Sequence, residues 1–444
     1  PLTLRPPSRF AVSSNHAAIH AARLGWGFTR VLSYQAAEAV ARSPGDGYTL
    51  YMTTAAHTIS ASLYKKLNYD PLKDFAPLTL TSTIPLVLVT APSLPVNSLA
   101  ELIAYAKASP QVCVLPVALK LENFELRTGA HVLRVELTAD RKRARGVTYV
   151  DGAGAEVFQP AEAVVLCAFG INNVRLLLLS GIGEPYDPVR NTGVVGRNYT
   201  HQTTSGVNLF FDESFNINPF MGAGAVAVTM DDFSADNFDH GPLGFVGGGY
   251  LQIQVVSGAP IGYHPVPKGT AAWGSAWKQA LRRYYNHSAS ITITGAAQPT
   301  RGGYLSLDPT YKDAWGLPLL RITYDLPDND IRMSAFLTER GDEIGRAMKG
   351  VQRTEPGPRK RPFTAAAYQS THLTGGAAMG ADPRTSVVNR YGQVWDVPNV
   401  FVTGAALFPQ NSGYNPTGTV GATAYWIVEK IKSDYLKSPG PLVT

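Results

Sequence analysis

The chain has 444 residues, of which 45% are hydrophobic and 16% are charged, and its formal net charge at pH 7 is +6. This composition excludes an intrinsically disordered chain and leaves room for two or three domains. The positive charge is scattered, and its one dense group, Arg353 to Arg361, is more typical of a solvated loop than of a nucleic-acid patch.

The two cysteines, Cys113 and Cys167, exclude a disulfide framework and an iron–sulfur cluster built from cysteines within this chain. Cys167 lies in an apolar run, so we expect it to be a buried free thiol. No apolar run reaches the length of a membrane span, because two asparagines and an arginine interrupt the run that comes nearest, residues 164–182. The chain begins at Pro1 without a basic-then-apolar secretory signal, and the compartment stays open.

Residues 1–34 show no sustained periodicity, and a short helix near residues 15–24 is the one element we expect there. Residues 35–112 alternate helix and strand signals, which is typical of a small α/β unit. The expected elements are a helix over Ala36 to Arg42, strands over Tyr48 to Thr53 and Pro85 to Thr90, and a helix over Leu99 to Ala108 capped by Ser98.

This segment resembles the start of the Bug family, the periplasmic receptors of tripartite tricarboxylate transport, in residues 37–50, 62–77 and 92–107. In those receptors two α/β lobes close on a small carboxylate, and the resemblance places the loop of Thr53, Thr54 and His57 on one wall. The resemblance stops near Pro110, before one lobe is complete. It therefore favours a structural remnant over a receptor that binds its ligand.

Strand-rich patterns replace this alternation from residue 113 onwards. We expect a half-buried strand within residues 123–137, a hairpin over residues 143–156 that turns at Asp151-Gly152, and a core strand over residues 163–168. Leu176 to Leu179, which follow that strand, fit the hydrophobic core. The histidines are scattered without accompanying carboxylates, so no metal site is expected.

Residues 207–365 alternate like antiparallel strands, at 207–212, 250–256 and 290–295, with helices expected over Trp273 to Arg283 and Asp330 to Met348. This pattern predicts an antiparallel-sheet substrate domain. Four aromatic residues fit either a sugar-stacking wall or the core, and we favour the core: Phe220, Tyr250, Trp273 and Tyr368.

The stretch from Ser370 to Ala424 carries two polar groups among many glycines: His372, which opens HLTGG, and Asn415, which opens NPTGT. Glycine lets the backbone approach a flat ligand closely, and a neutral histidine beside an asparagine suits removal of a hydroxyl proton. A purely structural role for His372 is the alternative. The only two acids of the stretch, Asp382 and Asp396, are expected in turns.

Residues 113–444 resemble the glucose–methanol–choline (GMC) oxidoreductases, flavoenzymes that oxidise alcohols and sugars. The resemblance rests on HLTG, SVVNRYG, NVFVTG, NPTGT, AFGINNVRLLLLSGIG and GVVGRNYTHQ. It implies FAD as cofactor, hydride transfer from a small alcohol or sugar, and a cytochrome or quinone as candidate electron acceptor. No nucleic-acid partner is implied.

The resemblance also implies roles for particular residues. His372 is the expected base, Asn415 its partner on the substrate oxygen, and His201 a second candidate base that we expect to be structural. The expected FAD neighbours are Val132, Ala168, Gly170, Gly404, Ala405, Asn415, Pro416 and Thr417. Residues 113–206 and 366–444 would form the FAD-domain portion, and residues 207–365 the substrate domain.

The family's first strand, GxGxxG turn and helix, which bind the FAD diphosphate, are not found ahead of residue 113. GAGAVA from Gly222 lacks the flanking strand and helix. We therefore expect a mixed α/β and α+β fold in which an incomplete FAD domain and an antiparallel-sheet substrate domain follow a small α/β fragment. Three functions stay open: a GMC enzyme or a relative inactivated by loss of that lobe, a carboxylate-binding receptor fragment, and a non-functional fusion.

Overall fold

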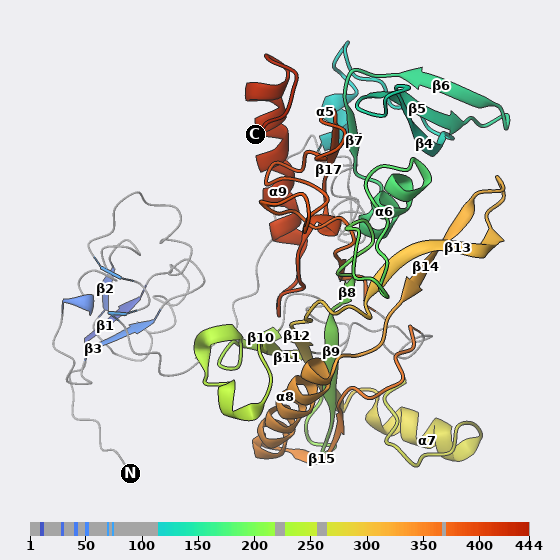
Figure 1. Cartoon of the computed structure of the whole chain (residues 1–444). Helices are drawn as coiled ribbons and strands as arrows, with labels where there is room; N and C mark the ends of the chain where they lie inside the picture. Colours follow the sequence, from blue (N-terminus) through green and yellow to red (C-terminus); the bar gives the residue numbers. More distant parts are fainter. Residues whose placement is uncertain are drawn as a thin grey trace. The chain divides into compact units, whose positions relative to one another are not determined.

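The structure is a computed structural model that divides into two units, Pro1–Leu121 and Glu122–Thr444 (Figure 1). It describes residues 9–12, 28–30, 40–42, 49–52, 69–70, 73–74, 114–217, 227–254, 264–365 and 370–443. Each unit is described by itself.

The first unit contains a three-stranded parallel sheet in the order β2 (Phe28–Arg30), β1 (Arg9–Val12), β3 (Thr49–Met52). Strand β3 confirms the strand expected over residues 48–53, whereas β1 and β2 form where the sequence predicted no strand. A short helix, α5 (Leu115–Ala118), lies near the end of this unit. Several expected features fall outside the described residues: the helices near 15–24 and 99–108, the strand over 85–90, and Thr53, Thr54 and His57.

The second unit opens with an antiparallel sheet in the order β4 (His131–Leu137), β5 (Ala144–Val150), β6 (Glu156–Pro160). Leu133 and Val135 are almost fully buried, as their alternation predicts. The Asp151 backbone N–H donates to the Ala155 carbonyl oxygen at 3.0 Å, which closes the turn between β5 and β6. The predicted hairpin is therefore confirmed.

Strand β7 (Val164–Leu166) pairs in parallel with β17 (Val400–Val402), and helix α6 (Gly170–Leu179) follows β7. The side chains of Val164 and Leu166 are buried, whereas Val165 is 42% exposed and Cys167 is exposed too. The prediction that Cys167 is buried is wrong. Alternate residues of a strand point to opposite faces, and Val165 and Cys167 share the face that the described residues leave uncovered.

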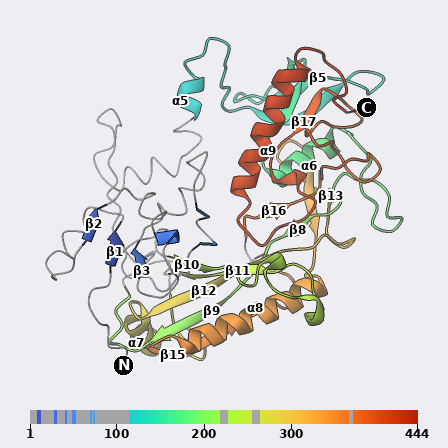
Figure 2. The same ribbon diagram turned by 90° about the vertical axis from the view of Figure 1, so that its left-hand side faces the viewer.

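A five-stranded antiparallel sheet forms the largest element of the second unit, in the order β10-β11-β12-β9-β15. Its strands are β9 (Thr203–Phe211), β10 (Ala227–Met230), β11 (Gly249–Gln254), β12 (Ser288–Gly295) and β15 (Val351–Gly357). Helix α8 (Asp328–Ala347) lies along this sheet in both views (Figures 1 and 2). Gly345 permits this close packing, because a Cβ there would stand 2.6 Å from Leu209 Cδ2. The expected antiparallel sheet and long helix are confirmed.

Two details differ from expectation around this sheet. Helix α7 (Ser275–Tyr284) begins after Trp273, whose side chain is 84% exposed rather than in the core. Arg353 lies on β15 rather than in a loop, and its guanidinium is 2.6 Å from the Glu355 carboxylate. Phe220 and Tyr368 lie outside the described residues.

A hydrophobic core surrounds β7, β17 and α6, and it includes Val174, Leu177 and Phe401. The remaining elements of the second unit are β8 (Thr200–His201) paired with β16 (Leu373–Thr374), β13 (Tyr304–Lys312) paired with β14 (Pro318–Thr323), α9 (Thr417–Lys430), and the short helices η2 (Ala235–Asn237), η3 (Gly241–Leu243), η4 (Ala405–Leu407) and η5 (Ile431–Tyr435).

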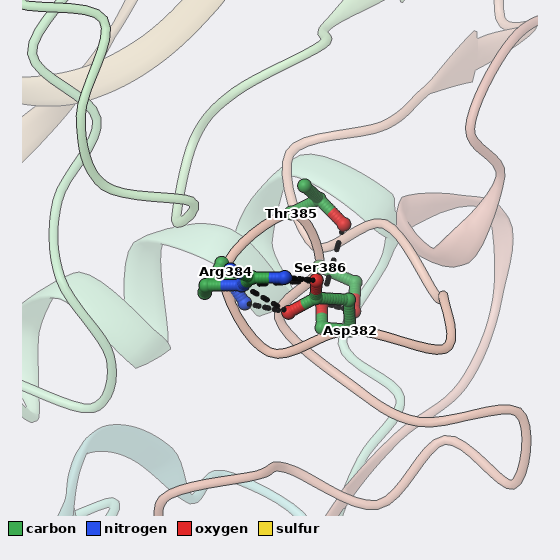
Figure 3. A network of polar contacts seen from close by, with 4 residues as sticks. All are labelled: Asp382, Arg384, Thr385 and Ser386. Carbon is green, nitrogen blue, oxygen red and sulfur yellow. Dashed lines mark hydrogen bonds and ion pairs between the residues drawn. The ribbon is translucent and has the colours of Figure 1, made fainter.

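Asp382 has the turn role that the sequence predicts (Figure 3). Its carboxylate accepts a hydrogen bond from the Arg384 backbone N–H at 2.9 Å and from the Arg384 guanidinium at 2.6 Å. These bonds hold the pKa of Asp382 down at about 2. Among the described residues, no helix is long and apolar enough to cross a bilayer.

Candidate active site

The pairing of β8 with β16 places His372 beside Gln202. Leu373 pairs with His201 and Thr374 with Thr200, and the Thr200 and Thr374 hydroxyls are 2.6 Å apart. The turn after β16 requires glycine at position 375, because φ is +86° and a Cβ would lie 1.9 Å from the Asn198 carbonyl oxygen. The glycine of the H-x-x-G motif thus fixes where the histidine lies.

His372 is held through its backbone and its ring. Its carbonyl oxygen accepts from the Gln202 backbone N–H at 3.2 Å and from Asn411 Nδ2 at 2.8 Å. Its own N–H donates to Ser370 Oγ at 3.1 Å, and ring atom Nδ1 forms a short hydrogen bond with Gln202 Oε1. Partial burial lowers the pKa of His372, so the ring is neutral at pH 7.

His372 opens onto a cavity of about 390 Å³, a volume within the usual range of small-molecule sites. The wall comes from the end of β7, the start of α6, η4 and the start of α9, and its residues are Cys167, Phe169, Gly170, Asn173, Thr371, His372, Leu373, Thr403, Gly404, Ala405, Pro416, Thr417, Val420 and Ala424. Five of the expected FAD neighbours belong to this wall: Gly170, Gly404, Ala405, Pro416 and Thr417.

The other three expected FAD neighbours lie elsewhere. Val132 is half-buried on β4 and packs against the core around β7. Ala168 is not part of the wall, although its sequence neighbours Cys167 and Phe169 are. Its backbone N–H donates to Asn173 Oδ1 at 2.7 Å. Asn415 precedes Pro416 but is not part of the wall, and its Oδ1 accepts from the Tyr250 hydroxyl at 3.2 Å.

Two features of the cavity wall suit a flat, electron-rich cofactor such as FAD. Helices α6 and α9 both begin at it, with Phe169 and Pro416 as N-caps that supply no side-chain hydrogen bond. Their first backbone N–H groups are therefore available to an electron-rich ligand. Gly404 has a φ of +88° and a Cβ there would meet no atom within 4 Å, so space remains open over η4.

Sequence reasoning missed three residues of this site. Gln202 is almost fully buried against His372. Asn173 joins the ends of β7 and β17, because its Oδ1 accepts from Ala168 N and its Nδ2 donates to the Thr403 carbonyl oxygen at 2.9 Å. Phe169 has a φ of +71°, which is rare for a bulky residue, and its ring is half-exposed at the cavity. The only available signal was their position beside residues already chosen.

His201 does not belong to the cavity wall. Its ring packs edge-on against Phe363 at 4.8 Å between centroids and lies near Tyr324. Burial lowers the pKa of His201 to about 4. A neutral, buried ring behind the site fits the structural role that we expected.

Asp330, at the start of α8, lies behind the site and is fully buried. Its carboxylate accepts hydrogen bonds from Asn329 Nδ2 at 3.1 Å and Thr203 Oγ1 at 3.3 Å. Desolvation nevertheless raises the pKa of Asp330 to about 6. Among the described residues, no three histidine, cysteine or acidic side chains are grouped to hold a metal ion.

His201 and Asp330 should influence the pH dependence of stability in opposite directions. The lowered pKa of His201 removes about 3 kcal/mol of stability as the pH falls from about 6.5 to about 4. The raised pKa of Asp330 adds a similar amount, about 3 kcal/mol, as the pH falls from about 6 to about 4. Asp330→Asn should therefore lose about 3 kcal/mol relative to the parent protein between pH 7 and pH 4.

Urea unfolding at several pH values measures this difference. The control is Asp328→Asn, two residues earlier on α8, where the side chain is 70% exposed. If the free energy of unfolding of both variants depends on pH in the same way as that of the parent, the assignment of Asp330 as the buried titrating group is wrong.

Residues 101–204 and 299–424 match the GMC oxidoreductase family. Residues 31–115 match the tripartite tricarboxylate transporter family receptor. Both matches confirm the resemblances expected from the sequence.

Three proteins of known name are similar to this chain over different shares of its length. The gluconate 2-dehydrogenase flavoprotein of Pantoea cypripedii is 54% identical over 341 residues, which cover 76% of this chain and 55% of that protein. The 2-methyl-1,2-propanediol dehydrogenase of Mycolicibacterium austroafricanum is 30% identical over 70% of this chain and 54% of its own length. Protein BugT of Bordetella pertussis is 36% identical over 21% of this chain and 32% of BugT. The chain thus spans about half the length of the two dehydrogenases.

Proposed function

This chain belongs to the GMC oxidoreductase family, and from that premise we propose that it oxidises the CH–OH group of a polyhydroxy substrate, with His372 as the base. The observation that supports the proposal is His372, whose pKa burial lowers, on the wall of a cavity between the starts of α6 and α9. The activity is a proposal and not a finding, because the chain spans about half the length of the two dehydrogenases that it matches.

His372 is suited to remove the hydroxyl proton of the substrate. Its ring is neutral, because burial lowers its pKa, and one nitrogen remains free of hydrogen bonds to described residues. Asn411 and Gln202 bind the backbone of His372, and Gln202 also binds its ring. The ring is therefore already oriented before the substrate binds. A positioned general base of this kind contributes roughly 10²- to 10⁴-fold to a rate.

We assign the cofactor's place to residues of this chain. Gly170, Gly404, Ala405, Pro416 and Thr417 would contact FAD, which supplies the hydride acceptor when it is bound. The N-termini of α6 and α9 would hold its electron-rich edge with backbone N–H groups. Asn415 is the proposed partner for the substrate oxygen, because its amide Nδ2 is left to donate when Oδ1 accepts from Tyr250.

The proposed substrate class is a sugar acid or polyol. The relative at 54% identity is named for gluconate, and a relative at 30% identity is named for a propanediol. Gluconate is therefore the first compound to test. A cytochrome or a quinone is the proposed electron acceptor. The division into an FAD portion at 113–206 and 366–444 and a substrate domain at 207–365 stays a prediction.

A carboxylate receptor is not proposed. The matching segment covers 32% of BugT, and the residues expected on the wall of the binding site lie outside the described residues.

Titration of the purified chain with FAD tests the cofactor assignment. We expect saturable quenching of flavin fluorescence and a rise in the unfolding temperature. Gly404→Phe, which fills the open space over η4, should weaken binding by at least tenfold. Gly154→Phe, at a φ of +85° in the turn between β5 and β6, should leave binding unchanged. Absence of saturable binding by the parent chain would remove FAD from the account.

A further inference from the structure

The side-chain amide of Gln202 has only one possible orientation. One of its terminal atoms lies 2.8 Å from the Ser412 carbonyl oxygen and 2.9 Å from the Tyr414 carbonyl oxygen. Two carbonyl oxygens at hydrogen-bond distance require a donor, so this atom is the nitrogen of the NH₂ group. The atom that faces His372 is therefore the carbonyl oxygen Oε1.

That orientation decides which nitrogen of His372 carries the proton. Oε1 can only accept, so Nδ1 of the neutral ring must donate to it. The lone pair is then on Nε2, which has no hydrogen-bond partner in the described part of the chain. A base with its lone pair on Nδ1 would point it at Gln202 instead of at a ligand.

We propose that Gln202 is a positioning residue that locks His372 in the Nδ1–H tautomer and leaves Nε2 to accept the substrate proton. Gln202 is held in place in three ways. Its side chain is buried, with 1% exposed, and its backbone N–H donates to the His372 carbonyl oxygen. Its side-chain NH₂ donates to the carbonyl oxygens of residues 412 and 414, just before Asn415. The catalytic value of this lock rests on the proposed function, but the tautomer itself does not.

The test measures the tautomer directly by ¹⁵N NMR of histidine-labelled protein at pH 8, with the His372 signals assigned by their loss in His372→Gln. The parent protein should show a protonated Nδ1 and an unprotonated Nε2. Gln202→Leu, which has a similar volume and no amide, should give a mixture of the two tautomers. The kcat of FAD-loaded Gln202→Leu should be roughly 10- to 100-fold lower than that of the parent, because the variant loses part of the rate factor that a general base contributes. Its KM should be nearly unchanged.

Gln393→Leu is the matched control. Gln393 is also buried, and its amide donates to two carbonyl oxygens, of Pro398 at 2.6 Å and Gly440 at 2.9 Å. It does not touch His372, so its loss should lower stability and leave the His372 tautomer unchanged. This variant separates positioning of the base from general support of the fold.

Gln202→Glu keeps the acceptor and removes the amide donor. Its carboxyl group, protonated or ionised, has an oxygen that accepts from Nδ1–H, whereas the ionised form cannot donate to the Ser412 and Tyr414 carbonyl oxygens. At pH 8 the Nδ1–H tautomer should therefore be retained in Gln202→Glu, in contrast to the mixture expected in Gln202→Leu.

A proton on Nε2 in the parent, or an unchanged tautomer in Gln202→Leu, would overturn the inference whatever the reaction is. An Nδ1–H tautomer in a protein that does not oxidise alcohols would support the lock and contradict only the proposed function.

Discussion

Replacing His372 by glutamine is expected to lower the turnover of the FAD-loaded protein by 10²- to 10⁴-fold. Glutamine can still hydrogen-bond to Gln202 but cannot take a proton near neutral pH. Because His372 is only partly buried and its backbone bonds remain, the free energy of unfolding should change by less than about 1 kcal/mol. Steady-state kinetics, FAD titration and urea unfolding of one preparation measure all three effects.

The pH profile adds a second signature to this variant. A base must be neutral to act, so activity of the parent should fall as the pH drops through the pKa of His372, which burial places below the usual value of about 6.5. In His372→Gln this acid limb should disappear. The control is His287→Gln, since His287 is half-buried with its Nδ1 2.8 Å from the Phe215 carbonyl oxygen, away from the cavity. Equal turnover in parent and His372→Gln would exclude His372 as the base.

Replacing Gly375 by alanine is expected to destabilise the protein by about 4 kcal/mol, the sum of a penalty for positive φ and a penalty for overpacking. The residue has a φ of +86°, and the new methyl group would lie 1.9 Å from the Asn198 carbonyl oxygen. Backbone must shift to relieve such a contact, and the pairing of β8 with β16 that holds His372 beside Gln202 would be lost with it.

Gly154→Ala separates the clash from the backbone conformation. Gly154 has nearly the same φ, +85°, but a Cβ there meets no atom within 4 Å. Alanine at this position should therefore cost only the conformational penalty of about 1–2 kcal/mol. Equal losses in the free energy of unfolding for the two variants would contradict the clash expected at Gly375.

Short motifs located His372 because the residues that shape its surroundings are its neighbours in sequence. Gly375 and Gly376, which follow His372, both have a φ of +86°. The His-Leu-Thr-Gly and Asn-Pro-Thr-Gly stretches both contribute residues to the cavity wall. Elements with strong alternation were predictable for the same reason, as β4, β5 and β12 demonstrate.

Gln202 could not be identified in this way. His201 is the last residue of β8 and Gln202 follows it. Their side chains point to opposite sides of the extended chain, His201 towards Tyr324 and Phe363 and Gln202 towards His372. The sequence alone cannot say which residue faces which way, and it drew attention to the histidine. The pairing of β8 with β16 in the structure shows that Gln202, and not His201, lies beside the His372 ring.

The burial of Cys167 was mispredicted for a related reason. An apolar strand is buried on both faces only if other elements cover both, and the number of such elements is a property of the whole fold. In the described residues β7 pairs with β17 alone, so Val165 and Cys167 remain exposed.

Absorption spectroscopy of the FAD-loaded chain, mixed with gluconate in the absence of oxygen, tests the central proposal most directly. The proposal predicts that the visible absorption band of oxidised flavin bleaches in the parent protein and persists in His372→Gln. Persistence of the band in the parent, across gluconate and a panel of polyols, would contradict a role for this chain in alcohol oxidation.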